Sequence, residues 1–265
     1  MQRILALTCC VPLLLLLGAD PATTAPALPK ELGIDLGGGV VIEMILVHPG
    51  TFTMGSEKGE DDEKPIHRVT ISRPFYMGEF EVTQQQWQAV MGENPSSFKG
   101  PKNPVDNVNW YDCQDFLKKL GEKAPGRTFR LPTEAQWEYA CRAGSSTAYS
   151  FGDDPAPIGD YAWYYGNSSA ATHPVGQKKP NAWGLYDMHG NVCEWCADWY
   201  SSTSYATGDA TDPSGAASGE SRVLRGESWV SNPDTLRSSY RVGTPEDYRN
   251  THVGLRIVCL PSKGD

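Results

Sequence analysis

The pattern of apolar and polar positions predicts a folded chain with few regular elements. Residues 40–47 (VVIEMILV) form an apolar run directly after a triple glycine, which is typical of a strand that begins a domain. Three helices are predicted from capping boxes, in which the first residue and the residue three positions later each bind the other's backbone N–H with a side chain. The pairs are Thr83 with Gln86, Asn109 with Asp112, and Thr133 with Gln136. In the third helix, Trp137 and Cys141 lie four residues apart and Gly144 stands where a helix would end.

Loops dominate the rest of the chain. Residues 28–39 look like a linker, so the domain is expected to span residues 40–262. Residues 144–180 are rich in glycine, serine, asparagine, aspartate and tyrosine and show little periodicity, which indicates a long ordered loop that carries function or binds an ion. Short strands are predicted at 222–225 and 253–259, and no internal repeat is visible. The pattern therefore favours one domain with many packed loops.

The amino-terminal segment has the layout of a secretory signal peptide. Arg3 precedes an apolar run at residues 4–17, and small and proline-rich residues follow it. A membrane-spanning helix needs about 20 apolar residues, so this shorter run is not expected to remain as a membrane span.

Two cleavage points fit this segment, after Ala19 or after Ala27, so residues 1–27 are the expected signal peptide. A lipid anchor on Cys9 or Cys10 is the alternative, although little apolar sequence precedes either cysteine. We expect an extracytoplasmic protein that is secreted, periplasmic or held at the cell surface.

Charge and composition narrow the class of partner. The net charge is −9 and no cluster of lysine and arginine is visible, which argues against a nucleic-acid surface. The chain contains 27 glycines, 20 prolines, 8 tryptophans and 12 tyrosines, a composition typical of a loop-rich globular protein with many aromatic contacts.

Several ordered motifs resemble the formylglycine-generating-enzyme family, also called sulfatase-modifying factors. The motifs are HPGTFTMGS at 48–56, PIHRV at 65–69, EVT at 81–83, PV at 104–105, VNW at 108–110, RLPTEAQWE at 130–138, GLYDMHGNVCEW at 184–195, VLRGESW at 223–229 and GLR at 254–256. The resemblance covers roughly residues 40–260. It implies an irregular α+β fold of the C-type-lectin-like kind, with a small twisted antiparallel sheet.

The resemblance also implies where the family's chemistry would lie. The founding activity oxidises a sulfatase cysteine to formylglycine, with two cysteines that hold copper(I), a metal that prefers soft sulfur ligands. Aligned on the family motif, these two positions fall at Ser231 and near Leu236, and neither side chain can supply a thiolate. Copper is therefore not expected. The turn before them reads Gly226-Glu227 where the family has two glycines.

A calcium site is implied by the same resemblance. Family members hold Ca²⁺ with a side-chain oxygen, two backbone carbonyls and a glutamate, and hard oxygen donors of this kind suit the ion. The matching positions are Asp187, Gly190, Val192 and Glu194. The alternative is a tight turn that carries two solvated acids.

Five cysteines remain after residues 1–27, an odd number, so at least one thiol is free or pairs between molecules. The resemblance implies a disulfide between Cys113 and Cys259. Cys193 and Cys196 have the spacing of a redox or zinc pair, yet no thioredoxin-like pattern surrounds them and no second pair completes a zinc site. A buried thiol or a bridge to Cys141 is the alternative for this pair.

The carboxy-terminal loops form the ligand surface in C-type-lectin-like folds, and aromatic rings beside small polar residues suit recognition. The candidate surface residues are Trp229, Asn232, Asp234, Arg237, Tyr240, Tyr248, Asn250 and His252. We expect a non-catalytic module that binds a protein, peptide or glycan.

Three other functions remain open. One is a divergent oxidase, for which Glu134 and Glu138, with the two acids of the calcium motif, could supply acid–base groups. Another is a variable protein of a diversity-generating retroelement, and the third is a structural partner in the cell envelope. The five histidines are scattered and form no metal-ligand cluster.

Overall fold

A computed structural model describes residues 27–205 and 208–262. The expected signal peptide lies outside these ranges apart from Ala27. No helix within the described residues is both long enough and apolar enough to cross a membrane.

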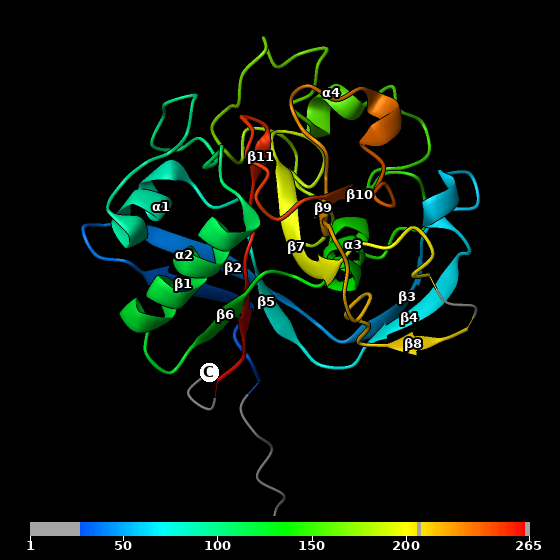
Figure 1. Cartoon of the computed structure of the whole chain (residues 1–265), viewed down its shortest axis with the longest axis horizontal. Helices are drawn as coiled ribbons and strands as arrows, with labels where there is room; N and C mark the ends of the chain where they lie inside the picture. The colour runs from blue at the N-terminus through cyan, green and yellow to red at the C-terminus, as the bar shows by residue number, and fades with distance from the viewer. Residues whose placement is uncertain (1–26, 206–207, 263–265) are drawn as a thin grey trace, which may run out of the picture.

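Three small sheets form the framework (Figure 1). The first is antiparallel and contains, in spatial order, β1 (Glu31–Asp35), β2 (Val41–Val47), β5 (Phe75–Gly78), β12 (Val258–Leu260) and β6 (Thr128–Arg130). The second contains β10 (Val242–Thr244), β9 (Arg222–Arg225), β7 (Cys193–Trp199) and β11 (Val253–Gly254), with β7 and β11 parallel. The third contains β3 (Gly50–Met54), β4 (His67–Ile71) and β8 (Ala210–Thr211), with β4 and β8 parallel. The α+β class is confirmed, and the antiparallel sheet is joined by two others.

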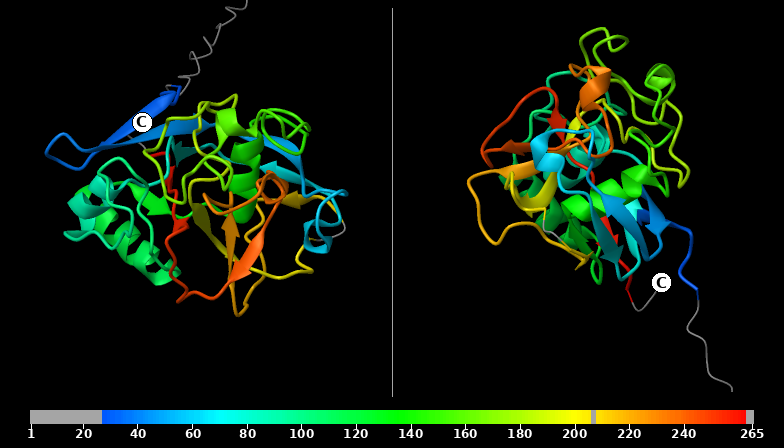
Figure 2. Two further views of the ribbon diagram at one scale, coloured as in Figure 1. Left: turned by 90° about the horizontal axis from the view of Figure 1, so that it is seen from above. Right: turned by 90° about the vertical axis from the view of Figure 1, so that its right-hand side faces the viewer.

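Two strand predictions differ from the structure. Residues 28–39, expected to be a linker, contain strand β1, which pairs along its whole length with β2 and closes a hairpin at the triple glycine. Viewed from above, this hairpin projects along one side of the molecule (Figure 2). The predicted strand 253–259 is divided, because residues 255–257 carry the chain from β11 in the second sheet to β12 in the first.

The three predicted helices are confirmed with their caps. They are α1 (Gln84–Met91), α2 (Trp110–Lys123) and α3 (Glu134–Arg142), and each begins with the expected reciprocal capping box. The long loop contains only the short helix α4 (Ile158–Tyr161), and 3₁₀ turns occur at η1 (Asp61–Glu63) and η2 (Pro233–Thr235).

Two hydrophobic clusters form most of the core. One lies between the first sheet, α1 and α2, where the rings of Trp87 and Phe116 stack 4.9 Å apart. The other surrounds α3, all of whose residues are buried. In Figure 1, α3 and β7 lie in the middle, with α1 and α2 to one side and the three-stranded sheet to the other. The central position of α3 explains why its charged side chains must find partners inside the protein.

The cysteines behave as apolar core residues. Cys113 is a buried free thiol, so the bridge to Cys259 implied by the resemblance is not formed in the structure. Cys193 and Cys196 lie on one strand three residues apart, and successive strand residues face opposite sides, so one packs in the first cluster and the other in the second. Both are free thiols, as is Cys141, so the structure contains no bridge from this pair to Cys141.

Candidate functional site

The two positions that align with the copper cysteines lie in an interior that no longer suits a soft metal. Ser231 is nearly buried, and its hydroxyl donates to the Glu227 carboxylate at 2.5 Å. Leu236 is fully buried in a small apolar cluster with Tyr149 and Ile158. Glu227 has a φ of 53°, in the left-handed region that favours glycine. A residue with a side chain is strained in this backbone conformation. A serine, a leucine and a carboxylate thus occupy the region where the family places thiols.

The thiols of Cys141, Cys193 and Cys196 are not activated. Burial raises the pKa of Cys141 to about 12, and it raises the pKa values of Cys193 and Cys196 well above the ordinary value. Cys141 Sγ lies 3.9 Å from His189 Nε2, but burial lowers the pKa of that histidine to about 4. The backbone N–H of Ser150 donates to the same Nε2, so the neutral ring carries its proton on Nδ1 and donates it to Leu236 O. A neutral thiol beside a neutral imidazole supplies no nucleophile at physiological pH.

The predicted carboxy-terminal surface divides into two groups. Tyr248, Asn250 and His252 lie together, with the Asn250 amide bonded to the Tyr248 hydroxyl at 2.9 Å. Trp229 joins this group through its indole N–H, which donates to Thr251 O. All four are half-buried rather than fully exposed.

The second group surrounds η2. Asn232 and Asp234 are exposed, whereas Arg237 forms two hydrogen bonds to Glu63 at 2.6 and 2.8 Å. Tyr240 lies beside Arg237, with the guanidinium carbon 5.7 Å from its ring centre. The charged members of this group therefore serve the fold as much as any ligand.

An exposed apolar patch lies between the long loop and the carboxy-terminal loops. Tyr165 is 73% exposed and Val230 is 40% exposed. The Tyr165 N–H donates to Ser231 O at 3.0 Å, which holds the two loops side by side. Sequence reasoning included Trp229 but missed Tyr165 and Val230, since only the fold brings residue 165 next to residue 230.

The predicted calcium residues lie in a buried acidic cluster. Burial raises the pKa of Asp187 to about 6, and one carboxylate oxygen accepts the Gly176 N–H at 2.7 Å. The other oxygen is buried and has no hydrogen-bond partner within the described residues. Burial, and then the charges of Asp187 and Glu194, raise the pKa of the fully buried Glu81. Three acids thus share a buried region in which Arg256 is the principal counter-charge.

These residues fit a hard cation only in part. The unpartnered oxygen of Asp187 and the surplus negative charge suit Ca²⁺. Glu194 does not fit as a ligand, because Arg256 binds its carboxylate at 2.8 Å and the Trp137 indole donates to it at 2.6 Å. The bonds of Val192 N–H to Glu81 and of Gly190 N–H to Gly226 O do not involve the carbonyl oxygens through which these two residues would bind calcium. The described chain contains no group of three histidine, cysteine or acidic side chains placed to hold a metal.

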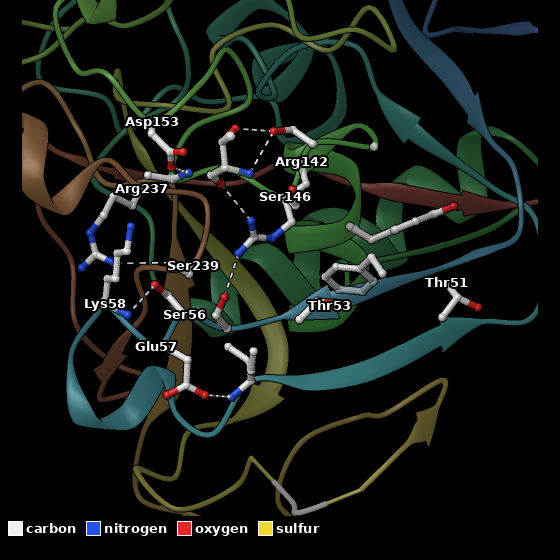
Figure 3. A pocket seen from close by; sticks show the side chains of 18 of the residues that line it. Thr51, Thr53, Ser56, Glu57, Lys58, Arg142, Ser146, Asp153, Arg237 and Ser239 are labelled. Atoms are coloured by element: carbon white, nitrogen blue, oxygen red, sulfur yellow. Dashed lines mark hydrogen bonds between the residues drawn. The ribbon is translucent and has the colours of Figure 1, made fainter.

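A cavity of about 580 Å³ lies away from the acidic cluster, between β3, the end of α3 and the start of the long loop (Figure 3). Its aromatic side is formed by Phe52, Tyr139 and Trp183. The ring centre of Tyr139 lies 5.3 Å from that of Phe52 and 4.8 Å from that of Trp183. Hydroxyl side chains, among them Ser146 and Ser239, line other parts. The volume falls within the range typical of small-ligand sites.

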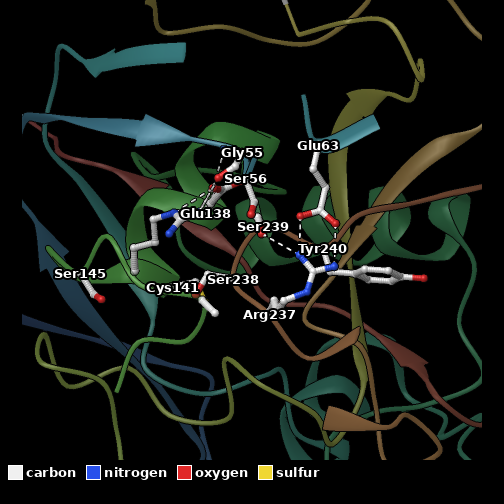
Figure 4. A network of polar contacts seen from close by, with 12 residues as sticks. Gly55, Ser56, Glu63, Glu138, Cys141, Ser145, Arg237, Ser238, Ser239 and Tyr240 are labelled. Carbon is white, nitrogen blue, oxygen red and sulfur yellow. Dashed lines mark hydrogen bonds and ion pairs between the residues drawn. The ribbon is translucent and has the colours of Figure 1, made fainter. Parts of the chain in front are cut away.

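A network of polar contacts lies beside this cavity and shares Gly55, Arg237 and Ser239 with its lining (Figure 4). Glu138 on α3 is fully buried; it accepts hydrogen bonds from Arg142 at 2.8 Å and Gly55 N at 2.9 Å and forms an ion pair with Arg225. Arg142 also donates to Gly55 O, so α3 holds the end of β3 through both backbone groups of one glycine. Arg142 and Arg237, which line the cavity, are therefore paired with carboxylates of the protein itself.

Arg237 alone among the predicted surface residues lines this cavity. The HPGTFTMGS motif, which contributes Thr51, Phe52 and Thr53 to the wall, marked the family resemblance but gave no sign of a site. Its alternation of threonine with apolar residues was the available signal for an exposed strand.

Comparison with known proteins agrees with this fold. The chain is 32% identical to the chaperone protein LppX of Paenibacillus barcinonensis, over 82% of this chain and 89% of that protein. It is also 32% identical to the formylglycine-generating enzyme of Streptomyces coelicolor, over 78% of this chain and 86% of that enzyme. Among solved structures, Treponema denticola variable protein 1 superposes with a TM-score of 0.82 at 34% identity, over 88% of this chain and all of that one. Residues 39–260 match the sulfatase-modifying factor enzyme 1-like domain, and the chain belongs to that family.

Proposed function

We propose that this protein is an extracytoplasmic, non-catalytic binding module of its family. The observation that carries the proposal is the donor set at the two copper-aligned positions, a hydrogen-bonded Ser231 and a buried Leu236. Copper(I) chemistry needs soft thiolates, and neither residue can provide one. The known relatives include an enzyme, a chaperone and a variable protein, so membership of the family does not by itself decide between catalysis and binding.

The recognition surface in this proposal centres on Tyr165, Trp229, Val230 and Asn232. Exposed aromatic and apolar side chains next to a polar residue give contact area at a small entropic cost. This patch borders Ser231, one of the two positions aligned with the copper cysteines. The proposal is therefore that the same face binds a partner without oxidising it.

Calcium is proposed as a stabilising ion beside Asp187. The unpartnered carboxylate oxygen and the surplus of buried acids support it, while the ion pair of Glu194 with Arg256 speaks against Glu194 as a ligand. Thermal unfolding in CaCl₂ and in EDTA tests this. We expect a higher Tm with calcium and no such difference in Asp187→Ala; equal Tm values in the natural protein would remove calcium from the proposal.

The decisive experiment is the oxidation assay. The purified domain is incubated with Cu(I), oxygen and a cysteine-containing sulfatase peptide, and the peptide mass is followed beside an active family enzyme. We expect no aldehyde product. Conversion of the peptide would overturn the non-catalytic reading.

A thiol-restored variant, Ser231→Cys with Leu236→Cys, tests the alignment itself. If both positions correspond to the copper ligands, this variant gains Cu(I) affinity that neither single variant shows. Export is tested separately by fusing residues 1–27 to a reporter that is active only outside the cytoplasm.

A further inference from the structure

Among the described residues, strand β3 has a partner strand on only one side. It is the terminal strand of the order β3-β4-β8, and its burial pattern alternates, with Thr51 and Thr53 exposed. The edge of a sheet exposes N–H and C=O groups that can pair with another chain.

The register identifies which backbone groups point outward. Asp212 N donates to Thr70 O at 2.9 Å on the β8 side of β4, so Thr70 directs its backbone groups away from β3. Thr51 lies opposite Thr70 in an antiparallel pair of strands. The backbone N–H and C=O groups of two such residues either point toward each other or both point away from each other. Thr51 therefore directs its N–H and C=O to the outer edge. The hydroxyls of Thr51 and Thr70 lie 3.1 Å apart, which agrees with a closely spaced pair of this kind.

The alternation continues along the strand. Thr53, two residues further, directs its backbone groups outward as Thr51 does. The next residue in this series is Gly55, and its N–H and C=O are bound by Glu138 and Arg142 of α3 instead of by β4. Within residues 27–205 and 208–262, the N–H and C=O groups of Thr51 and Thr53 have no hydrogen-bond partner.

These free groups border the cavity described above. The cavity is lined by three consecutive residues, Thr51, Phe52 and Thr53, so it runs along the edge of β3 rather than over one face. Ser145 of the long loop and Trp183 also line the cavity, so an extended chain added beside β3 would meet both.

The walls define the chemistry of an occupant. Side chains of an added strand would point alternately to solvent and to the aromatic side formed by Phe52, Tyr139 and Trp183. Arg142 and Arg237 are paired with Glu138 and Glu63, and the other charged side chains of the lining are Lys58, Glu57 and Asp153. The site therefore suits a segment without acidic residues that has an apolar side chain at every second position.

We propose that an extended peptide segment of a partner protein binds in this cavity as an added strand on the outer edge of β3. Four backbone hydrogen bonds, two at Thr51 and two at Thr53, give affinity, and the aromatic wall selects alternate apolar side chains. This site lies apart from the surface around Trp229, so it extends the proposed function and can fail independently of it.

The test uses a proline scan of β3. In Thr53→Pro the lost N–H is one that faces outward, and edge strands tolerate proline there, so the variant is expected to fold with a Tm close to that of the natural protein. Thr53→Val keeps the N–H and is the matched control. Phe52→Pro removes an N–H that faces β4, and we expect a strongly lowered Tm.

The probe is a short soluble peptide in which valine alternates with threonine, with lysine at both ends, titrated by calorimetry. We expect saturable binding to the natural protein and to Thr53→Val, and binding at least about tenfold weaker to Thr53→Pro. Hydrogen exchange should show that the peptide slows exchange at the amides of Thr51 and Thr53. Methylation of every backbone nitrogen of the peptide should abolish binding.

Four results would overturn the proposal. The first two are a failure of the unmethylated peptide to bind and an equal affinity of Thr53→Val and Thr53→Pro for it. The other two are protection of the Thr51 and Thr53 amides by self-association of the protein alone, and binding of a neutral oligosaccharide in the cavity in place of the peptide. The oxidation assay at Ser231 and Leu236 is unaffected by any of these, so the two proposals are judged separately.

Discussion

Replacement of Glu138 by glutamine should strongly destabilise the fold. The carboxylate is fully buried, where burial alone would raise its pKa, but the charges of Arg142 and Arg225 outweigh this and lower it. Glutamine keeps the shape and can still accept the Gly55 N–H, but it removes the carboxylate that Arg142 and Arg225 share, so Arg142 loses its counter-charge and Arg225 keeps its pair with Glu134. Breaking a buried ion pair on one side costs about 3–5 kcal/mol.

Equilibrium unfolding in urea measures the change. Asp61→Asn is the matched control, because it makes the same chemical change at an exposed carboxylate paired with Lys64 and should leave the midpoint unchanged. Since the folded pKa of Glu138 is lowered, its contribution to stability is present above the unfolded value and is lost as the pH falls. A loss below about 1 kcal/mol for Glu138→Gln would refute the reasoning that this network holds α3 to β3.

Three further changes test other parts of the fold. Burial and then the charge of Glu134 raise the pKa of Asp198 to about 7, so the free energy of unfolding should fall as the pH rises from about 4 to 7. Asp198→Asn should reduce this fall by up to about 4 kcal/mol. A pH curve parallel to that of the natural protein would count against the assignment. Ala143→Gly should raise stability by about 0.5–1 kcal/mol in the same urea assay, because Ala143 ends α3 at a φ of 47°; a decrease would show that its buried methyl group matters more. Thr83→Ala should cost about 1 kcal/mol by removing the cap of α1, and an unchanged midpoint would contradict the capping role.

Local signals predicted the helices well because their causes are local. Each capping box joins residues three apart, so the sequence alone contains both partners. Strand β1 was missed although Leu32 and Ile34 alternate with polar or small residues, because Gly33 and the following glycines suggested a linker. The division of residues 253–259 between two sheets depends on the strands that they meet, and these come from distant segments.

The candidate sites were less predictable because their partners are far apart in the sequence. Arg237 was assigned to a ligand surface, yet it binds Glu63, 174 residues away. Glu194 was assigned to calcium, but the position of Arg256 could not be inferred from spacing. The free edge of β3 follows from the hydrogen bond between Asp212 N and Thr70 O, and both residues lie outside the motif HPGTFTMGS.

The complete burial of α3 has a consequence for how such proteins are classified. The segment 130–138, one of those by which the chain resembles its family, forms caps, core contacts and arginine pairs. These residues hold the fold whatever chemistry the domain performs, so the segment identifies the fold and not the reaction. Within this family, a gene product is better assigned to oxidation or to binding by the two side chains at positions 231 and 236 than by its overall similarity score.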